Sequence, residues 1–324
     1  MDFENHVFLK KKLSDFDEEH PLLVNLELSP KVMDYVEELL KKLEETPNFA
    51  TKIDDMKNPS NWESIFSELK FARKVIALNP EFIKEEEFSR TPDIKVSLLN
   101  RDIFFEVKML SDSIEILHIR AEIQKIKSNL KVYVHFNWDY KDNKRQADEL
   151  VKYIKDKVKF NSVGTFTFEG NSIRIDRKVM SKTKRTPFSY CQSRGKVLSE
   201  DLRKKIRGKF HDKVSQFESR KPIFWVIDCE EWGYDITDFK KAFYGDKICT
   251  RKTILELFNE HYFDPECSFL DNKGIFTLDK TECLSGVIVM TEGDMYLLIN
   301  PLAKQQLDTD SMRQLRKALE HEES

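Results

Sequence analysis

Hydrophobic residues recur at helical spacing in the first quarter of the chain. One such stripe lies in residues 31–45 and consists of Val32, Val36, Leu39, Leu40 and Leu43. A second helix is predicted at 62–78, between the capping segment 58–61 and Pro80. Its apolar face consists of Trp62, Ile65, Phe66, Leu69, Ala72 and Ile76. The pattern therefore predicts an N-terminal part that is mostly helical.

After Pro80 the spacing changes to the alternation that is typical of strands. We predict strands at about 84–89, at 93–99 and at 102–109, with Asn100-Arg101 as a hairpin turn between the last two. A helix at about 114–128, a strand at 131–137 and a helix at about 145–159 follow. Residues 163–177 predict another hairpin, which turns at 169–171.

The last part of the chain again mixes helices and strands. Residues 178–198 are basic, contain Pro and Gly, and predict an exposed loop, after which Ser199 caps a helix that ends at about 217. Pro222 precedes the nearly all-apolar segment IFWVID, which is typical of a strand in the middle of a sheet. Helices are predicted at about 237–243, 251–260 and 309–320, and a hairpin at 286–299. This order of elements indicates an α/β fold.

Composition excludes several other classes of protein. The 324 residues include 40% hydrophobic and 11% aromatic residues, enough for a sizeable core, and only 9 Gly and 10 Pro. No segment has the roughly 20 apolar residues that span a bilayer, and the N-terminus does not resemble a secretory signal. Five widely spaced cysteines form no CxxC pair, and the seven histidines form no HxxxH or HxH pattern. We therefore expect a cytoplasmic protein without a membrane partner and without a zinc or histidine-based site.

Charge is distributed unevenly along the chain. Residues 1–50 carry 6 basic and 12 acidic side chains, whereas residues 141–215 carry 21 basic and 9 acidic ones, although the net charge is only −3. Such a local excess of positive charge attracts polyanions. The alternative is a solvated, lysine-rich surface without a partner.

Three charged residues stand in the predicted hairpin at 93–109. Asp93 begins one strand, and Glu106 lies near the far end of the other, so the two carboxylates can come together across the ladder. Glu106 and Lys108 are two residues apart on one strand, which points both side chains to the same face. Two converging carboxylates are typical ligands of Mg²⁺. The pattern predicts a metal site suited to phosphodiester hydrolysis.

The tripeptide itself carries little information. The chain contains (D/E)xK nine times, but Glu106-Val-Lys108 stands alone in an apolar, aromatic strand pattern. Pro92-Asp93, thirteen residues upstream of Glu106, is the only Pro-Asp in the sequence. Burying an acidic and a basic residue in such a strand costs free energy, which favours a functional role over a solvated ion pair at a sheet edge.

The run of a helix, Pro92-Asp93 and a strand ending in Glu106-Val-Lys108 resembles the PD-(D/E)xK, or restriction-endonuclease-like, superfamily of nucleases. The resemblance covers about residues 61–138, with weaker agreement to about 228. It implies that Asp93 and Glu106 bind Mg²⁺ or Mn²⁺ and that Lys108 positions the attacking water. Many members add an acidic residue from the preceding helix, and this role falls to Glu68, which borders the apolar face, whereas Glu63 lies toward solvent.

The resemblance also implies a division of the chain and a substrate. It places the nuclease core, with a central mixed sheet flanked by helices, at 51–230. This core includes a basic hairpin and loop insertion at about 160–198, and it stands between an N-terminal helical segment (1–50) and a C-terminal α/β extension (231–324). The superfamily often has a later helix that contacts the nucleic-acid backbone, here LRKKIRGKFHDKVSQF. The residues expected to bind nucleic acid, DNA before RNA, are Lys182, Lys184, Arg185, Arg194, Lys209, Lys213 and Gln216.

Three alternatives to an active nuclease stay open at this point. The chain could be a nucleic-acid-binding protein that keeps the fold without catalysis, or a structural protein in which ExK is accidental. It could also be an effector of bacterial defence, acting as a homodimer or with a partner protein that releases its activity. Nothing in the basic stretch encodes base readout, and the sequence does not indicate a cutting specificity.

Overall fold

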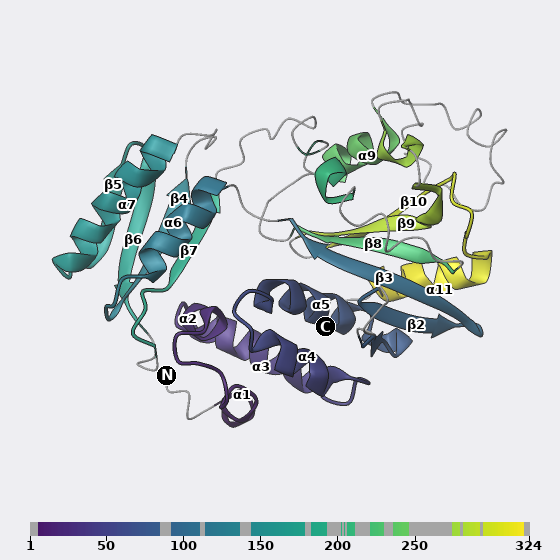
Figure 1. Cartoon of the computed structure of the whole chain (residues 1–324), viewed down its shortest axis with the longest axis horizontal. Coiled ribbons are helices and arrows are strands. Elements are labelled where there is room, and N and C mark those ends of the chain that lie inside the picture. The colour runs from purple at the N-terminus through teal and green to yellow at the C-terminus, as the bar shows by residue number, and fades with distance from the viewer. Residues whose placement is uncertain are drawn as a thin grey trace. The chain divides into compact units, whose positions relative to one another are not determined.

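The computed structural model describes residues 6–84, 92–110, 114–136, 144–178, 183–192, 202, 204, 206–210, 221–229, 236–245, 274–278, 281–291 and 294–320. These residues form two compact units, each assembled from separate stretches of chain. The first unit comprises the described residues within Met1–Glu44, Ile53–Ile65 and Ser111–Gly195, and the second those within Glu45–Lys52, Phe66–Leu110 and Lys196–Ser324. Each unit has a β-sheet of its own (Figure 1).

The first unit begins with helices, as the sequence predicted. These are α1 (Val7–Lys12), α2 (Pro21–Leu26) and α3 (Pro30–Leu43). Proline stands in the first turn of α2 and of α3, where its missing N–H would have no partner in the helix. The Ser29 hydroxyl oxygen accepts a hydrogen bond from the Val32 N–H at 3.2 Å and caps α3. Two further helices, α4 (Phe49–Met56) and α5 (Trp62–Lys74), contribute residues to both units.

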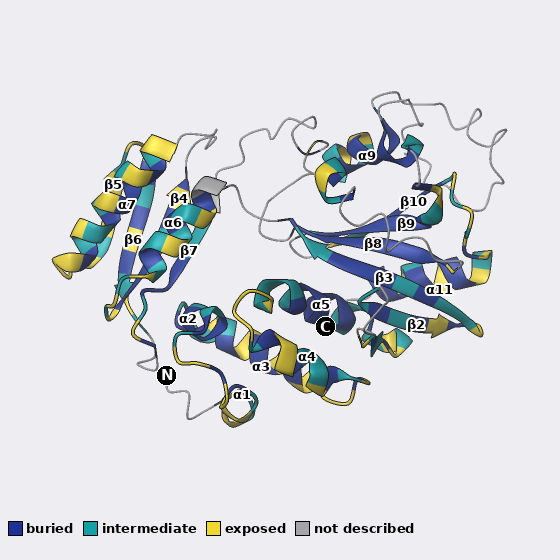
Figure 2. Ribbon diagram, viewed as in Figure 1, coloured by how far each residue is buried: buried dark blue, intermediate teal, exposed yellow. Residues whose placement is uncertain are grey.

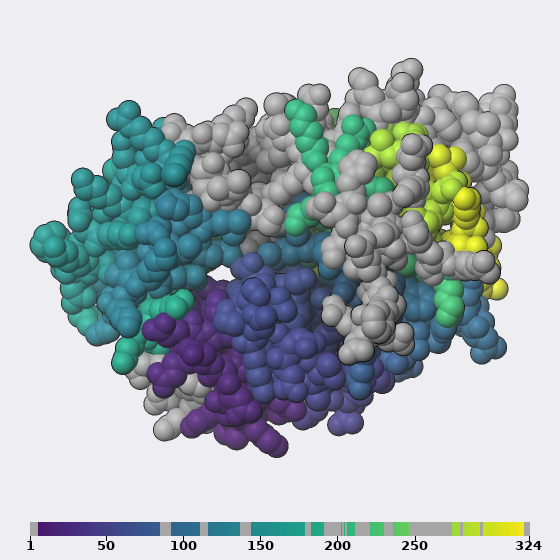
Figure 3. Space-filling model, in the orientation of Figure 1, coloured from purple at the N-terminus to yellow at the C-terminus, as the bar shows by residue number. Residues whose placement is uncertain are grey.

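A four-stranded sheet forms the other part of the first unit. Its strands are β4 (Leu130–Phe136), β5 (Gly164–Phe168), β6 (Asn171–Arg177) and β7 (Phe188–Gln192), in the order β5-β6-β4-β7. Ile119 of α6 (Ile114–Gln124) and Ile154 of α7 (Lys144–Lys159) share a buried core with Val132 of β4. The atoms of the chain from about residue 114 to residue 192 are coloured from blue to teal in Figure 3 and gather at the left of the view. The predicted hairpin at 163–177 is confirmed, with Glu169 and Gly170 at positive φ in its turn.

The loop predicted at 178–198 was wrong in its central part. Residues 188–192 form β7, which pairs in parallel with β4. Phe188 is buried and Tyr190 packs against the same core, so two alternating aromatic side chains hold this segment in the sheet despite its basic flanks.

The second unit contains a six-stranded sheet in the order β1-β2-β3-β8-β9-β10. Its strands are β1 (Glu81–Phe82), β2 (Ile94–Leu98), β3 (Arg101–Met109), β8 (Ile223–Asp228), β9 (Gly286–Met290) and β10 (Met295–Ile299). Strands β3, β8 and β9 are parallel and the other pairs antiparallel, so the sheet is mixed. Strand β8, the predicted IFWVID strand, is buried along its whole length (Figure 2).

Helices cover both faces of this sheet. On one face, Phe71 of α5 packs on Phe105 of β3, with 5.0 Å between ring centroids. On the other face, Trp225 of β8 contacts Phe210 of the helical residues 206–210 and Phe243 of α9 (Ile236–Tyr244). The remaining elements of this unit are the short 3-10 helices η2 (Ile76–Leu78), η4 (Ile275–Thr277) and η5 (Thr281–Cys283), and α11 (Thr309–Glu320). The predicted α/β fold with a mixed central sheet flanked by helices is confirmed.

Several predicted boundaries need correction. The hairpin between β2 and β3 turns at Leu99 and Asn100, with φ of 48° and 64°, and Arg101 is the first residue of β3. Asn tolerates this left-handed conformation, which fits the two-residue turns favoured in hairpins. Strand β1 ends at Phe82, and most of the predicted strand at 84–89 and all of the helix at 251–260 lie outside the described residues. None of the helices in the described ranges is long and apolar enough to cross a membrane.

Candidate active site

The β2–β3 hairpin brings Asp93 against the strand that carries the predicted motif. Ile94 pairs with Phe105, and Asp93 extends the ladder because its N–H donates to the Phe105 carbonyl at 3.0 Å. The Asp93 carboxylate also accepts a hydrogen bond from the Val107 N–H, with 2.8 Å between Oδ2 and N. These two bonds fix both the backbone and the side chain of Asp93 beside β3.

The pleat of β3 then places Glu106 and Lys108 on one face, as predicted. The Lys108 Nζ lies 3.0 Å from Glu106 Oε1 and 3.6 Å from Asp93 Oδ2. Phe105 and Val107 point to the opposite face and are fully buried. Glu106 is also fully buried, so its carboxylate depends on nearby cations. A single ammonium group thus joins the two carboxylates that the sequence paired.

Glu68 is held by a lysine that the sequence analysis did not identify. Glu68 lies on α5, and its Oε2 is 2.6 Å from the Nζ of Lys52 on α4. Glu68 is buried and Lys52 is largely buried, with exposed side-chain fractions of 5% and 12%. Glu63, the other acidic residue considered on this helix, instead forms an ion pair with Arg120 at 2.5 Å. The local sequence around Lys52 does not identify it as the partner of Glu68, because the contact joins two separate helices.

The carboxylates and lysines influence one another electrostatically. Burial, and next the negative charge of Asp93, raise the pKa of Glu68 to about 8, although Lys52 and Lys108 both act to lower it. Burial acts to lower the pKa of Lys108, but Asp93 and Glu106 outweigh this effect and hold the pKa above its ordinary value. Lys108 therefore carries its positive charge at neutral pH in the metal-free protein.

A second buried ion pair lies next to this group. Lys70, two residues after Glu68 on α5, has its Nζ 2.6 Å from Oδ2 of Asp228. Asp228 is the last residue of β8 and pairs with Met109, the residue after Lys108. The sequence offered a signal for Asp228, since it is the one charged residue in the apolar IFWVID strand.

The carboxylates of Asp93 and Glu106 are the side chains at this site that could hold a hard divalent cation. Mg²⁺ in proteins is usually held by one or two carboxylates, with water and substrate phosphate completing its coordination. Asp93 and Glu106 fit this requirement, because both already contact one cation, the Lys108 ammonium. Within the described ranges, however, no group of three or more His, Cys, Asp or Glu side chains could hold a metal together. Glu68, which is paired with Lys52, is therefore not part of a ready three-carboxylate site.

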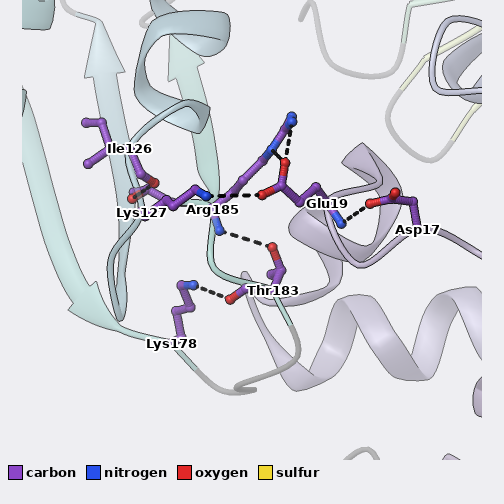
Figure 4. Close-up of polar contacts among 8 residues, drawn as sticks. Asp17, Glu19, Ile126, Lys127, Lys178, Thr183 and Arg185 are labelled. Carbon is purple, nitrogen blue, oxygen red and sulfur yellow. Dashed lines mark hydrogen bonds and ion pairs between the residues drawn. The ribbon is translucent and has the colours of Figure 1, made fainter.

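The residues expected to bind nucleic acid are distributed between the two units. Lys209 lies near the site, where its Nζ donates to the Met109 carbonyl at 3.0 Å. Lys184 is exposed, whereas the guanidinium of Arg185 is bound by Glu19, at 2.8 Å and 3.1 Å, and Lys127 reaches the same carboxylate (Figure 4). The other residues expected in this role lie outside the described residues; they are Lys182, Arg194, Lys213 and Gln216.

No protein-family model, curated protein or solved structure matches the chain.

Proposed function

We propose that the chain is a divalent-metal-dependent nuclease of the PD-(D/E)xK superfamily, with a restriction-endonuclease-like core, that hydrolyses phosphodiester bonds of nucleic acid. One observation carries the proposal: Asp93 and Glu106, from neighbouring strands, meet at the ammonium of Lys108. The order of elements also supports it. Helix α5 precedes three antiparallel strands, and a further strand, β8, then pairs in parallel with the strand that carries Glu106.

Each residue of the site has a role that follows from its surroundings. Held by Asp93 and Glu106, Mg²⁺ or Mn²⁺ would supply Lewis acidity and charge neutralisation at the scissile phosphate. As an ammonium, Lys108 would donate hydrogen bonds to the attacking water and balance the negative charge that grows on the phosphate. The Val107 N–H fixes the orientation of Asp93 through its bond to Oδ2. Lys209 of the helical residues 206–210, whose Nζ lies at the end of β3, is suited to contact a phosphate of the nucleic-acid backbone.

DNA is the favoured substrate by analogy with the superfamily. The basic stretch at 182–213 supports binding of a nucleic acid but does not distinguish DNA from RNA. Lysine and arginine contacts to phosphates provide affinity that does not depend on base sequence and that weakens with salt. A role in bacterial defence, with or without a partner protein, belongs to the same proposal.

Calorimetric titration with Mg²⁺ and Mn²⁺ tests the proposed site without a substrate. The wild-type protein should bind the cation, and Asp93→Asn should weaken binding by about tenfold or more, because it removes one of two negative ligands. Asn can still accept the bond from Val107, so the hairpin is preserved. The control is Asp102→Asn, which alters a carboxylate on β3 of the same hairpin, where it is bound by Lys221 and Ser97.

Equal cation binding by wild type and Asp93→Asn would refute the metal site. Absence of cation binding together with salt-sensitive DNA binding would favour the alternative, a non-catalytic nucleic-acid-binding protein that retains the nuclease fold.

A further inference from the structure

Lys52 provides a positive charge next to the buried Glu68 carboxyl, although it belongs to none of the motifs identified in the sequence. Its Nζ lies 2.6 Å from Glu68 Oε2, and the side chains of Lys52 and Glu68 are only 12% and 5% exposed. A buried charge is costly unless it is paired, so each of these two groups depends on the other. The pair lies within the second unit, which also contains Asp93, Glu106 and Lys108.

Glu68, the ion-pair partner of Lys52, links Lys52 to the proposed metal site. Glu68 experiences both the negative charge of Asp93 and the positive charge of Lys108. With Glu68 ionised, three carboxylates and two ammonium groups give this cluster a formal charge of −1, and with Glu68 protonated the formal charge is 0. Without Lys52 the cluster would be more negative and would attract a further cation more strongly.

We propose that Lys52 is an internal counter-cation that competes with a divalent metal for the carboxylate cluster. The inference rests on the proposed function, since it concerns the metal site of Asp93 and Glu106. In the metal-free protein the Lys52 ammonium is attracted to the cluster, whereas a bound divalent cation repels it. The free energy of this change opposes metal binding, whether or not Glu68 carries a proton. Lys52 is thus a positioning residue that stabilises Glu68 in the metal-free protein and lowers the affinity for metal.

A purely structural ion pair between α4 and α5 would behave differently. Its removal would lower stability but leave the affinity for a cation unchanged. Lys95 and Glu81 provide a comparison in the same unit, because their Nζ–Oε2 distance is also 2.6 Å while the pair lies nearer the surface. Lys95→Met therefore removes an ion pair of the same length, but it removes no charge from the proposed metal site.

The experiment is a calorimetric titration of the full chain with Mg²⁺ alone, for wild type, Lys52→Met, Lys52→Arg and Lys95→Met. We expect Lys52→Met to bind Mg²⁺ about three- to tenfold more tightly than wild type, which corresponds to the loss of one nearby positive charge. Lys52→Arg keeps the charge, and Lys95→Met lies outside the cluster, so both should stay within about twofold of wild type. Circular dichroism checks the fold of each variant, and Lys52→Gln replaces Lys52→Met if the latter does not fold.

The outcomes separate this inference from the proposed function. If wild type binds Mg²⁺ and loss of the Lys52 charge does not tighten binding, Lys52 does not compete and the metal site stands. If only the variant that lacks the Lys52 charge binds Mg²⁺, competition is supported in its strongest form. If no variant binds Mg²⁺, both the inference and the metal site are overturned.

Discussion

Folding shifts the pKa of the Glu68 carboxyl group far from its ordinary value. Its side chain is buried, and this burial, together with Asp93, raises its pKa to about 8 from an ordinary value of 4.5. The folded protein therefore binds this proton more tightly than the unfolded chain does. The contribution of Glu68 to stability is complete below about pH 4.5 and is lost as the pH rises through about 8.

This shift predicts a pH dependence of stability in the metal-free protein. We expect the free energy of unfolding to fall by a few kcal/mol between about pH 5 and pH 8, at about 1.4 kcal/mol per unit of pKa shift. Glu68→Gln should flatten this slope, because the amide does not ionise. Urea unfolding at a series of pH values, with EDTA present, measures it. The control is Glu81→Gln, a more exposed carboxylate of the same unit, and an unchanged slope in Glu68→Gln would contradict the assignment.

At this scale the sequence predicted the site in part. Asp93, Glu106 and Lys108 could be identified because the pleat and the hairpin register depend only on local spacing. Lys52 could not, because its contact with Glu68 joins two helices whose packing no local pattern encodes. The Glu19 contact of Arg185 was missed for the same reason, since the two residues are far apart in the chain.

At the scale of elements, α5 is attached to the sheet by a buried ion pair as well as by apolar packing. Lys70 and Asp228 have exposed side-chain fractions of 10% and 2%, and they join α5 to the end of β8. The same helix carries Glu68, so this pair helps to set where Glu68 lies along β3. Removing one partner of such a pair leaves a buried charge, whereas removing both often costs little.

We predict that Lys70→Met lowers the free energy of unfolding by about 3–5 kcal/mol. The double variant Lys70→Met/Asp228→Leu should recover most of this loss, because no unpaired charge remains. Denaturation followed by tryptophan fluorescence measures both values, with Trp225 buried in the core of this unit. A double variant as unstable as Lys70→Met would show that the pair is not the cause.

Most elements were predictable because their periodicity is strong. Helix α11 and the hairpins of β5–β6 and β9–β10 lie where the sequence placed them. Strand β7 was not predicted, because the basic residues and Pro187 around it are typical of a loop. Its two aromatic side chains indicate a strand only once their packing against the core beside β4 is known. The turn at Leu99 was displaced by one residue because Leu rarely adopts positive φ.

At the scale of the whole molecule, no pattern along the chain indicates that the strands form two separate sheets. Strand β4 follows the motif strand β3 closely in the chain, yet it belongs to the four-stranded sheet, and the parallel partner of β3 is the distant β8. Residues 286–299, assigned from sequence to a C-terminal extension, supply two strands of the sheet that carries the site. Strand order depends on contacts between distant segments, and alternation alone does not encode them.

Metal-dependent cleavage of nucleic acid tests the central claim most directly. Wild type, Asp93→Asn and Lys108→Ala would be incubated with plasmid, linear and single-stranded DNA in Mg²⁺ and in Mn²⁺, with EDTA as the blank. We predict cleavage by wild type that EDTA abolishes, and rates lower by about 10²–10⁴-fold in both variants. Equal cleavage by all three proteins, or none by wild type, would contradict a nuclease site at Asp93, Glu106 and Lys108.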